Sequence, residues 1–235
     1  MSSSNRLAGF RSGALAIAPL AVAVVPFGLI LGAEAVRHGL APAEAMLMSA
    51  TVFAGGAQFL AVGLWERPAP WATLALAALL VNLRHTLMSA SLVRKMGAFG
   101  PWRRAAAAFV LTDEAWATCE RHALRQPLTP AYYASVALTL YIVWNVSTAF
   151  GTAAGALFPH PERFGLDFAF PAAFIGMVMG FSKSWRAAPI IGASAAAAVV
   201  THHLIGGAWH VIAGGCAGVA VAFAVPPKAQ PEAPR

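Results

Sequence analysis

Long apolar stretches separated by short polar ones dominate this chain, and they predict helices that cross a membrane. Uncharged runs extend over residues 13–33, 45–65 and 126–158, and each reaches or exceeds the roughly 20 residues that a helix needs to cross a bilayer. The pattern predicts an all-α integral membrane protein, a polytopic bundle of about seven or eight helical segments. We expect these segments near residues 13–33, 45–65, 70–93, 105–124, 132–158, 167–181, 187–204 and 208–225.

Composition supports this class. Hydrophobic residues make up 59% of the 235 residues and charged residues 11%, which is too apolar for a soluble domain of this size. The net charge of +7 could suggest a nucleic-acid partner. However, the basic residues lie at the ends of apolar runs and form no basic-aromatic stripe, so we expect them to report topology instead. Cys119 and Cys216 show no metal or redox spacing and are expected to be packing residues.

The N-terminal sequence imitates a secretory signal, because Arg6 and Arg11 precede an apolar run. That run is too long for a signal and contains Pro19 and Pro26. We therefore expect a retained first membrane helix. The predicted organisation is a cytoplasmic N-terminal segment over 1–12, a transmembrane domain over 13–225, and a disordered Pro-rich tail over 226–235.

Three stretches are candidates for interrupted helices, one of them the short segment over 167–181 that carries Pro171. In the second segment, Gly55 and Gly56 precede an uncharged Gln58 at predicted mid-depth. Paired glycines either permit a break that exposes backbone N–H and C=O groups to a transported ligand, or simply allow close helix contact. The same two readings apply to Pro26, Phe27 and Gly28 in the first segment.

The third segment carries Asn82, Arg84 and His85 well inside an apolar run. On a helix, Asn82, His85 and Ser89 share one face, and Arg84 lies on the neighbouring face. A guanidinium at the centre of a bilayer costs at least about 2.5 kcal/mol, so it is usually paired or faces a cavity. The alternative is that Arg84 extends to the interface near Arg94.

The fourth segment, AAAAFVLTDEAWATCERHAL, differs from the others because it carries acidic residues. Asp113, Trp116 and Glu120 lie on one helical face. In one reading the acids are buried opposite Arg84, where Asp113 and Glu114 would be candidates for proton coupling because burial raises a carboxyl pKa. In the other reading this helix lies at the membrane surface with its charges solvated.

The loop charges do not fit a simple count of crossings. Residues 94–104 contain four basic residues and mark the cytoplasm. If the N-terminus is inside and the first three segments all cross, this loop falls outside. A re-entrant or interrupted second segment followed by a fourth that does not cross would remove the conflict, and so would an outside N-terminus.

An internal duplication is also suggested. Phe27-Gly28-x3-Gly32 resembles Phe150-Gly151-x3-Gly155, and each is followed by a helix-breaking segment and an apolar run that begins with Trp. Secondary transporters often contain such repeats with paired interrupted helices. Chance similarity in an Ala/Gly-rich sequence is the alternative.

Five short stretches, PFGLILG, VFAGGAQF, NLRH, LTDE and DFAFPAAF, occur in that order. In them the chain, from about residue 11 to 225, resembles the AzlC-type large subunit of bacterial branched-chain amino-acid exporters. The resemblance implies multi-pass insertion in the inner membrane, export of neutral, mostly branched-chain amino acids, and a small membrane partner of the AzlD type. Met88 departs from the pattern, since an aromatic residue is expected there.

The first hypothesis for function is a secondary exporter. Arg84 or the N-terminus of a broken helix could bind a substrate carboxylate, and Gln58, Asn82 or backbone carbonyls could accept from its ammonium. Phe53, Phe59, Leu60 or Phe174 could form the apolar wall. The candidate substrate-binding residues are Gly55, Gly56, Gln58, Asn82, Arg84 and His85, and the candidates for proton coupling are Asp113 and Glu114.

Two other classes compete with it. A non-transporting scaffold or channel subunit would need only small-residue packing, so the depth of Arg84 argues against it. An intramembrane metalloenzyme could use His202, His203 and His210, but no His-Glu-x-x-His or Gly-x-Ser-x-Gly motif is present. A Gly-x4-Gly-Lys-Ser/Thr loop is also absent from the sequence. We therefore expect no enzyme activity, no metal or other cofactor, and no direct use of ATP.

Overall fold

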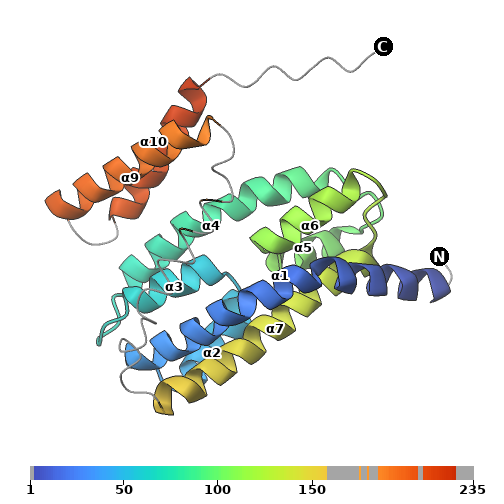
Figure 1. Ribbon diagram of the computed structural model, residues 1–235, viewed down its shortest axis with the longest axis horizontal. Helices are drawn as coiled ribbons and strands as arrows, with labels where there is room; N and C mark the ends of the chain where they lie inside the picture. The colour runs from blue at the N-terminus through green and yellow to red at the C-terminus, as the bar shows by residue number, and fades with distance from the viewer. Residues whose placement is uncertain (1–2, 158–174, 176–178, 180–184, 206–208, 226–235) are drawn as a thin grey trace. The chain divides into compact units, whose positions relative to one another are not determined.

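The computed structural model describes residues 3–157, 175, 179, 185–205 and 209–225, and every element within them is a helix (Figure 1). The chain divides into two compact units, Met1–Phe170 and Pro171–Arg235. In the first unit the helices are α1 (Ser3–Arg37), α2 (Pro42–Val52), α3 (Gly55–Gly63), α4 (Trp71–Val93), α5 (Pro101–Phe109), α6 (Asp113–Ala123) and α7 (Pro130–Leu157). The predicted class, an all-helical polytopic membrane protein, is confirmed.

Helices α1 and α7 lie side by side and run in the same direction (Figure 1). Gly13, near the start of α1, packs against Ser135 near the start of α7, and Gly155, near the end of α7, packs against Ala33. Ser135 Oγ also donates to the Phe10 carbonyl at 2.5 Å. Glycines without a Cβ let the two backbones approach closely, so this pair forms the scaffold of the unit.

The predicted break at Pro26–Gly28 is wrong. Helix α1 continues through both Pro19 and Pro26. A Cβ on Gly28 would collide with Ser147 of α7, and one on Gly32 would collide with the α7 backbone. Close helix packing, the other reading of these residues, therefore explains them.

The second predicted segment is interrupted, and its two halves form a hairpin, α2–α3. Helix α2 ends at Val52 and α3 begins at Gly55, with Phe53 in the left-handed region (φ 39°) between them. The loop after α3 returns to the end of the unit where α2 began, because Arg67 Nη2 donates to the Gly39 carbonyl at 2.7 Å. The hairpin therefore enters the unit and leaves it at the same end.

A second hairpin, α5–α6, enters from the opposite end. The expectation of one continuous helix over 105–124 is wrong, because α5 ends at Phe109 and α6 begins at Asp113. Thr112 starts the second helix, because its side chain accepts from the Ala115 N–H as an N-cap. Arg104 of α5 donates to the Met96 carbonyl just after α4, which places the open side of this hairpin at the C-terminal end of α4.

This arrangement removes the conflict between the basic loop at 94–104 and the number of membrane crossings. Three helices of the unit, α1, α4 and α7, are long and apolar enough to cross a membrane, whereas each hairpin returns to its own side. The start of α1, the end of α4 and the start of α7 consequently share one end, which we call the basic end. It carries Arg11, Arg94, Lys95, Arg103, Arg104, Arg121 and Arg125. The re-entrant second segment and the non-crossing fourth segment are thus the correct solution.

The second unit is a helical pair, α9 (Ala187–Leu204) and α10 (Trp209–Ala224). The helices run antiparallel: Gly214 packs against Ala198, and Gly218 packs against Ile190. Helix α9 is a fourth candidate membrane span. The predicted segment over 167–181, Phe174 and the tail over 226–235 lie outside the described residues, apart from the isolated positions 175 and 179.

The two similar Phe-Gly stretches lie against each other. Gly32 of α1 contacts Gly151 of α7, and Gly151 contacts Leu29. Because α1 and α7 are parallel, these two stretches have the same orientation. The helix-breaking segment of the second copy falls largely outside the described residues, so the duplication stays a prediction.

Candidate functional site

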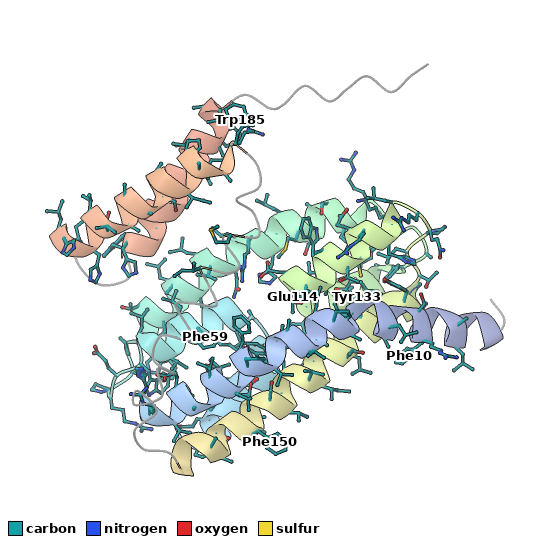
Figure 2. All side chains as sticks on the ribbon, in the orientation of Figure 1. Phe10, Phe59, Glu114, Tyr133, Phe150 and Trp185 are labelled. Carbon is teal, nitrogen blue, oxygen red and sulfur yellow. The ribbon has the colours of Figure 1, made fainter. Side chains whose placement is uncertain are left out.

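The two hairpins meet in the interior of the first unit, at Arg84 of α4. Figure 2 labels Phe59 on α3 and Glu114 at the start of α6, one residue of each hairpin. The N-terminus of α3 and the N-terminus of α6 both lie next to the Arg84 guanidinium. A helix N-terminus carries partial positive charge, so two partially positive helix ends and the Arg84 cation lie close together here.

Arg84 forms an ion pair with the tip of the α5–α6 hairpin. Its Nη1 lies 3.0 Å from Asp113 Oδ2, and the two side chains are 36% and 34% exposed. The acids of the fourth segment therefore do lie opposite Arg84, as one of the two sequence readings expected. Arg84 is paired in the interior, and its Nε is buried with no partner among the described residues.

The two glycines at the start of α3 face two different neighbours. A Cβ on Gly55 would stand 3.0 Å from the Trp144 ring of α7, and one on Gly56 would stand 3.0 Å from Arg84 Nη2 of α4. Each glycine thus admits one large side chain against the α3 backbone. In the described part of the chain no side chain caps α3, so its first N–H groups have no intrahelical acceptor.

Gln58 connects α3 to the scaffold. It is fully buried, and its Oε1 accepts a 3.0 Å hydrogen bond from Trp144 Nε1. Its Nε2 is also buried, and it has no partner among the described residues. Trp144 was not among the predicted site residues. The signal available was a tryptophan inside a long apolar segment, because a buried indole N–H requires an acceptor.

Asn82 and His85 lie one helical face away from Arg84. The buried inward face of α4 carries Ala77 and Met88 together with the partly buried Arg84. Asn82 and His85 are half-buried on the flank of this face. The Asn82 Oδ1 atom is buried and has no partner among the residues that the structure describes. The structure thus brings Gly56, Arg84 and Asp113 together, and His85 lies close enough to interact with both charges.

A second polar contact between α4 and α6 lies nearer the basic end. Trp116 Nε1 donates to Ser91 Oγ at 2.8 Å, and Ser91 Oγ donates to Glu120 Oε1 at 3.0 Å. Lys95 forms an ion pair with the same Glu120 carboxylate. Asp113, Trp116 and Glu120 therefore share one helical face, as predicted, and that face binds α4 along its whole length.

Glu114 lies beside this face on α6, which is not one of the four candidate spans. Burial raises the pKa of Glu114, and the neighbouring charge of Asp113 acts in the same direction. The Arg84 charge and the Thr112 side chain lower it by smaller amounts. Glu114 thus takes up a proton more readily than an exposed glutamate does.

A small cavity of about 60 Å³ lies between α4, α5 and the start of α7. Leu111 lies at its inner side, next to the hairpin tip, and Arg104 lies at the basic end. This volume holds a few water molecules.

The site at the junction of the two hairpins offers a cation, two helix N-termini and a carboxylate, groups suited to a small ligand that carries both charges. Within the described ranges, no group of three His, Cys, Asp or Glu side chains could hold a metal ion.

Comparison with known proteins points to one family. The family described as AzlC protein matches residues 19–158, a range that includes both hairpins, Arg84 and Trp144. An uncharacterized membrane protein of Archaeoglobus fulgidus is 30% identical over 156 residues, 66% of this chain and 67% of the relative. Inner membrane protein YgaZ of Escherichia coli is 25% identical over 178 residues, 73% of each chain. An uncharacterized membrane protein of Helicobacter pylori is 28% identical over 153 residues, 65% of this chain and 66% of the relative. No solved structure matches.

Proposed function

The chain belongs to the AzlC family of membrane proteins, and from this premise we propose that it is a secondary transporter that exports branched-chain and other neutral apolar amino acids. It would act in the bacterial inner membrane as a multi-pass protein, be driven by the proton motive force, and work with a small AzlD-type subunit. One relative carries the name of an inner membrane protein, which supports the location. The family resemblance supports the substrate class and the partner.

The observation that carries the proposal is the meeting of two opposed hairpins at the Arg84–Asp113 ion pair. The hairpin α2–α3 enters from one end and α5–α6 from the other, and both tips contact Arg84. Transporters bind substrates near the middle of the membrane at interrupted helices, whose free ends supply polar groups inside an apolar interior. A site of this kind can be reached from each side by moving one hairpin at a time.

The proposed site residues have distinct roles. The α3 N-terminus, with Gly55 and Gly56, would bind the substrate carboxylate together with Arg84. Gln58 Nε2 is a buried donor for the same carboxylate, and Asn82 and His85 flank the site. One of the two acids at the tip of the α5–α6 hairpin, Asp113 or Glu114, would carry the proton. Phe53, which stacks edge-on against Tyr141 with ring centroids 4.9 Å apart, would contribute to the apolar wall.

The exposed face of α4 supports a partner within the membrane. Leu79, Leu83 and Leu87 form an apolar stripe with exposed fractions of 60%, 53% and 75%. Lipid tails or a small apolar subunit would cover such a stripe equally well. The family resemblance favours the subunit.

Efflux measurements test the proposal. Cells that lack the protein and cells that express it are loaded with a leucine-containing dipeptide, which peptidases hydrolyse inside the cell. We expect expressing cells to release leucine several-fold faster, Arg84→Ala to abolish this gain, and Arg103→Ala, which removes an exposed arginine at the basic end, to retain it. Equal release by cells with and without the protein would refute export.

A further inference from the structure

The Arg84–Asp113 ion pair combines a cation with a carboxylate, as an amino-acid zwitterion does. Both side chains are about one-third exposed, at 36% and 34%, so neither is sealed from a ligand. A zwitterion can enter such a pair with its carboxylate on the guanidinium and its ammonium on the Asp113 carboxylate. As long as Asp113 is ionised, the site has the same net charge with and without substrate, which avoids an unpaired charge.

We propose that Asp113 binds the substrate ammonium and also carries the transported proton, so that amino acid and proton exclude each other at a single carboxylate. This inference rests on the function proposed above and adds a mechanism to it. It assigns the ammonium to Asp113 instead of to Gln58, Asn82 or a backbone carbonyl. It also makes the exchange an antiport.

The carboxylate half of the site stands on three observations. Arg84 Nη2 lies against Gly56 at the first turn of α3, which in the described part of the chain has no side-chain cap. Gln58, in the same turn, keeps a buried and unpartnered Nε2. Arg84 therefore approaches the free α3 N-terminus with one nitrogen and Asp113 with the other.

The ammonium half needs a full negative charge. An amide oxygen such as that of Asn82 offers only a dipole, and an ammonium in a low-dielectric interior is stabilised far better by a carboxylate. Asp113 is the carboxylate in contact with Arg84 at the hairpin junction. Glu120, on the same face of α6, is already bound by Lys95 and Ser91.

The charged groups around Asp113 are few. Arg84 and His85 belong to α4, and Glu114 follows Asp113 on α6. Helices α3 and α7 contain no Asp, Glu, Lys, Arg or His, and α1 has none between Arg11 and Glu34. The nearest rival for the proton is therefore Glu114, and a test must separate it from Asp113.

The exchange balances as follows. When the ammonium of a cytoplasmic amino acid binds protonated Asp113, the carboxyl proton leaves to the cytoplasm and an ion pair forms. When the amino acid departs on the outer side, a proton from outside takes its place. Each cycle thus moves an amino acid outward and a proton inward. Because the zwitterion has no net charge, the cycle carries a positive charge inward and uses the membrane potential as well as the pH gradient.

Proton release on substrate binding tests the inference. The full-length protein in lipid nanodiscs, in weakly buffered solution with a pH indicator, receives leucine, isocaproate (leucine without its ammonium) or isoamylamine (leucine without its carboxylate), at several pH values. We expect leucine to release protons and isocaproate to release none. Asp113→Asn should lose the release, Asp113→Glu should restore it in part, and Glu114→Gln should keep it.

Each contrary outcome has a definite meaning. Unchanged release in Asp113→Asn, or loss of release in Glu114→Gln alone, overturns the assignment to Asp113 while leaving export standing. Leucine binding without any proton release by the wild-type protein overturns the competition mechanism. Absence of leucine binding by a wild-type protein that is folded in the nanodisc, as judged by circular dichroism, overturns the proposed substrate and this inference together.

Discussion

The indole Nε1 of Trp144 on α7 donates a 3.0 Å hydrogen bond to the Oε1 of Gln58 on α3. Both residues are buried, and the bond connects a hairpin tip to one of the two scaffold helices. The bond therefore holds the first turn of α3 against α7, next to Arg84.

Replacing Trp144 tests how much the hydrogen bond between Trp144 and Gln58 contributes to the stability of the protein. Trp144→Phe leaves Gln58 buried with neither end of its amide paired among the described residues, so we expect a loss of about 1–3 kcal/mol in stability. Thermal unfolding in detergent measures it. Trp71→Phe, at a residue 71% exposed, is the matched control. The double variant Trp144→Phe/Gln58→Met should recover part of the loss, and no recovery would argue against the hydrogen bond as its cause.

Gly55→Ala should destabilise the protein. The added methyl group would stand 3.0 Å from the Trp144 ring, and overpacking of this kind costs about 1–3 kcal/mol. Gly63→Ala is the control at the other end of the same helix, where nothing lies within 4 Å. It should be neutral or slightly stabilising, since alanine is favoured over glycine in a helix by up to about 1 kcal/mol. Equal melting temperatures for the two variants would contradict the close contact.

Gly56→Ala should affect transport more than stability. Its methyl group meets the end of the flexible Arg84 side chain, which can move aside. The guanidinium is then displaced from the α3 N-terminus, where the carboxylate is proposed to bind. We expect a melting temperature close to wild type and efflux reduced at least several-fold. Wild-type efflux would remove this contact from the site.

The parallel packing of α1 and α7 can be tested by crosslinking. A Cβ on Gly9 would stand 3.7 Å from the Ala131 Cβ, within the range of a disulfide. Gly9→Cys combined with Ala131→Cys should therefore form an intramolecular disulfide under mild oxidation, seen as a mobility shift that reductant reverses. Gly9→Cys with Leu138→Cys, two turns further along α7, should not.

The direction of the two hairpins can be tested by thiol labelling from outside the cell. In a background without Cys119 and Cys216, Glu66→Cys in the α3–α4 loop should label in intact cells with an impermeant maleimide. Gly97→Cys, at the basic end, should label only after permeabilisation, because positive loops face the cytoplasm. The reverse pattern would invert the assigned orientation.

Sequence patterns predicted the helical class, and one of the two readings of the fourth segment placed its acids opposite Arg84. That reading follows because charge inside an apolar run is costly and therefore informative. The mismatch in loop charges was also informative: it left either segments that do not cross or an outside N-terminus, and the structure contains two hairpins of the first kind, α2–α3 and α5–α6.

The positions of the helix breaks could not be predicted from the local sequence pattern. Whether a glycine marks a break or a close contact depends on what faces it. Gly28 and Gly55 follow similar apolar contexts, yet one lies inside a continuous helix against Ser147 and the other starts a new helix against Trp144. The break before Asp113 was missed because an Ala-rich run has high helix propensity, whereas tertiary contacts and the Thr112 N-cap decide where α6 begins.

The glycine-lined contact between α1 and α7 also restricts how this protein can change shape. At Gly32, Gly151 and Gly155 the backbones of the two helices contact each other directly, so sliding one helix along the other would produce collisions there. A sliding or rocking motion within this pair is therefore disfavoured. The parts that can move are the hairpins α2–α3 and α5–α6, each of which enters and leaves the unit at its own end. Opening the site inward and opening it outward would therefore be movements of two different hairpins.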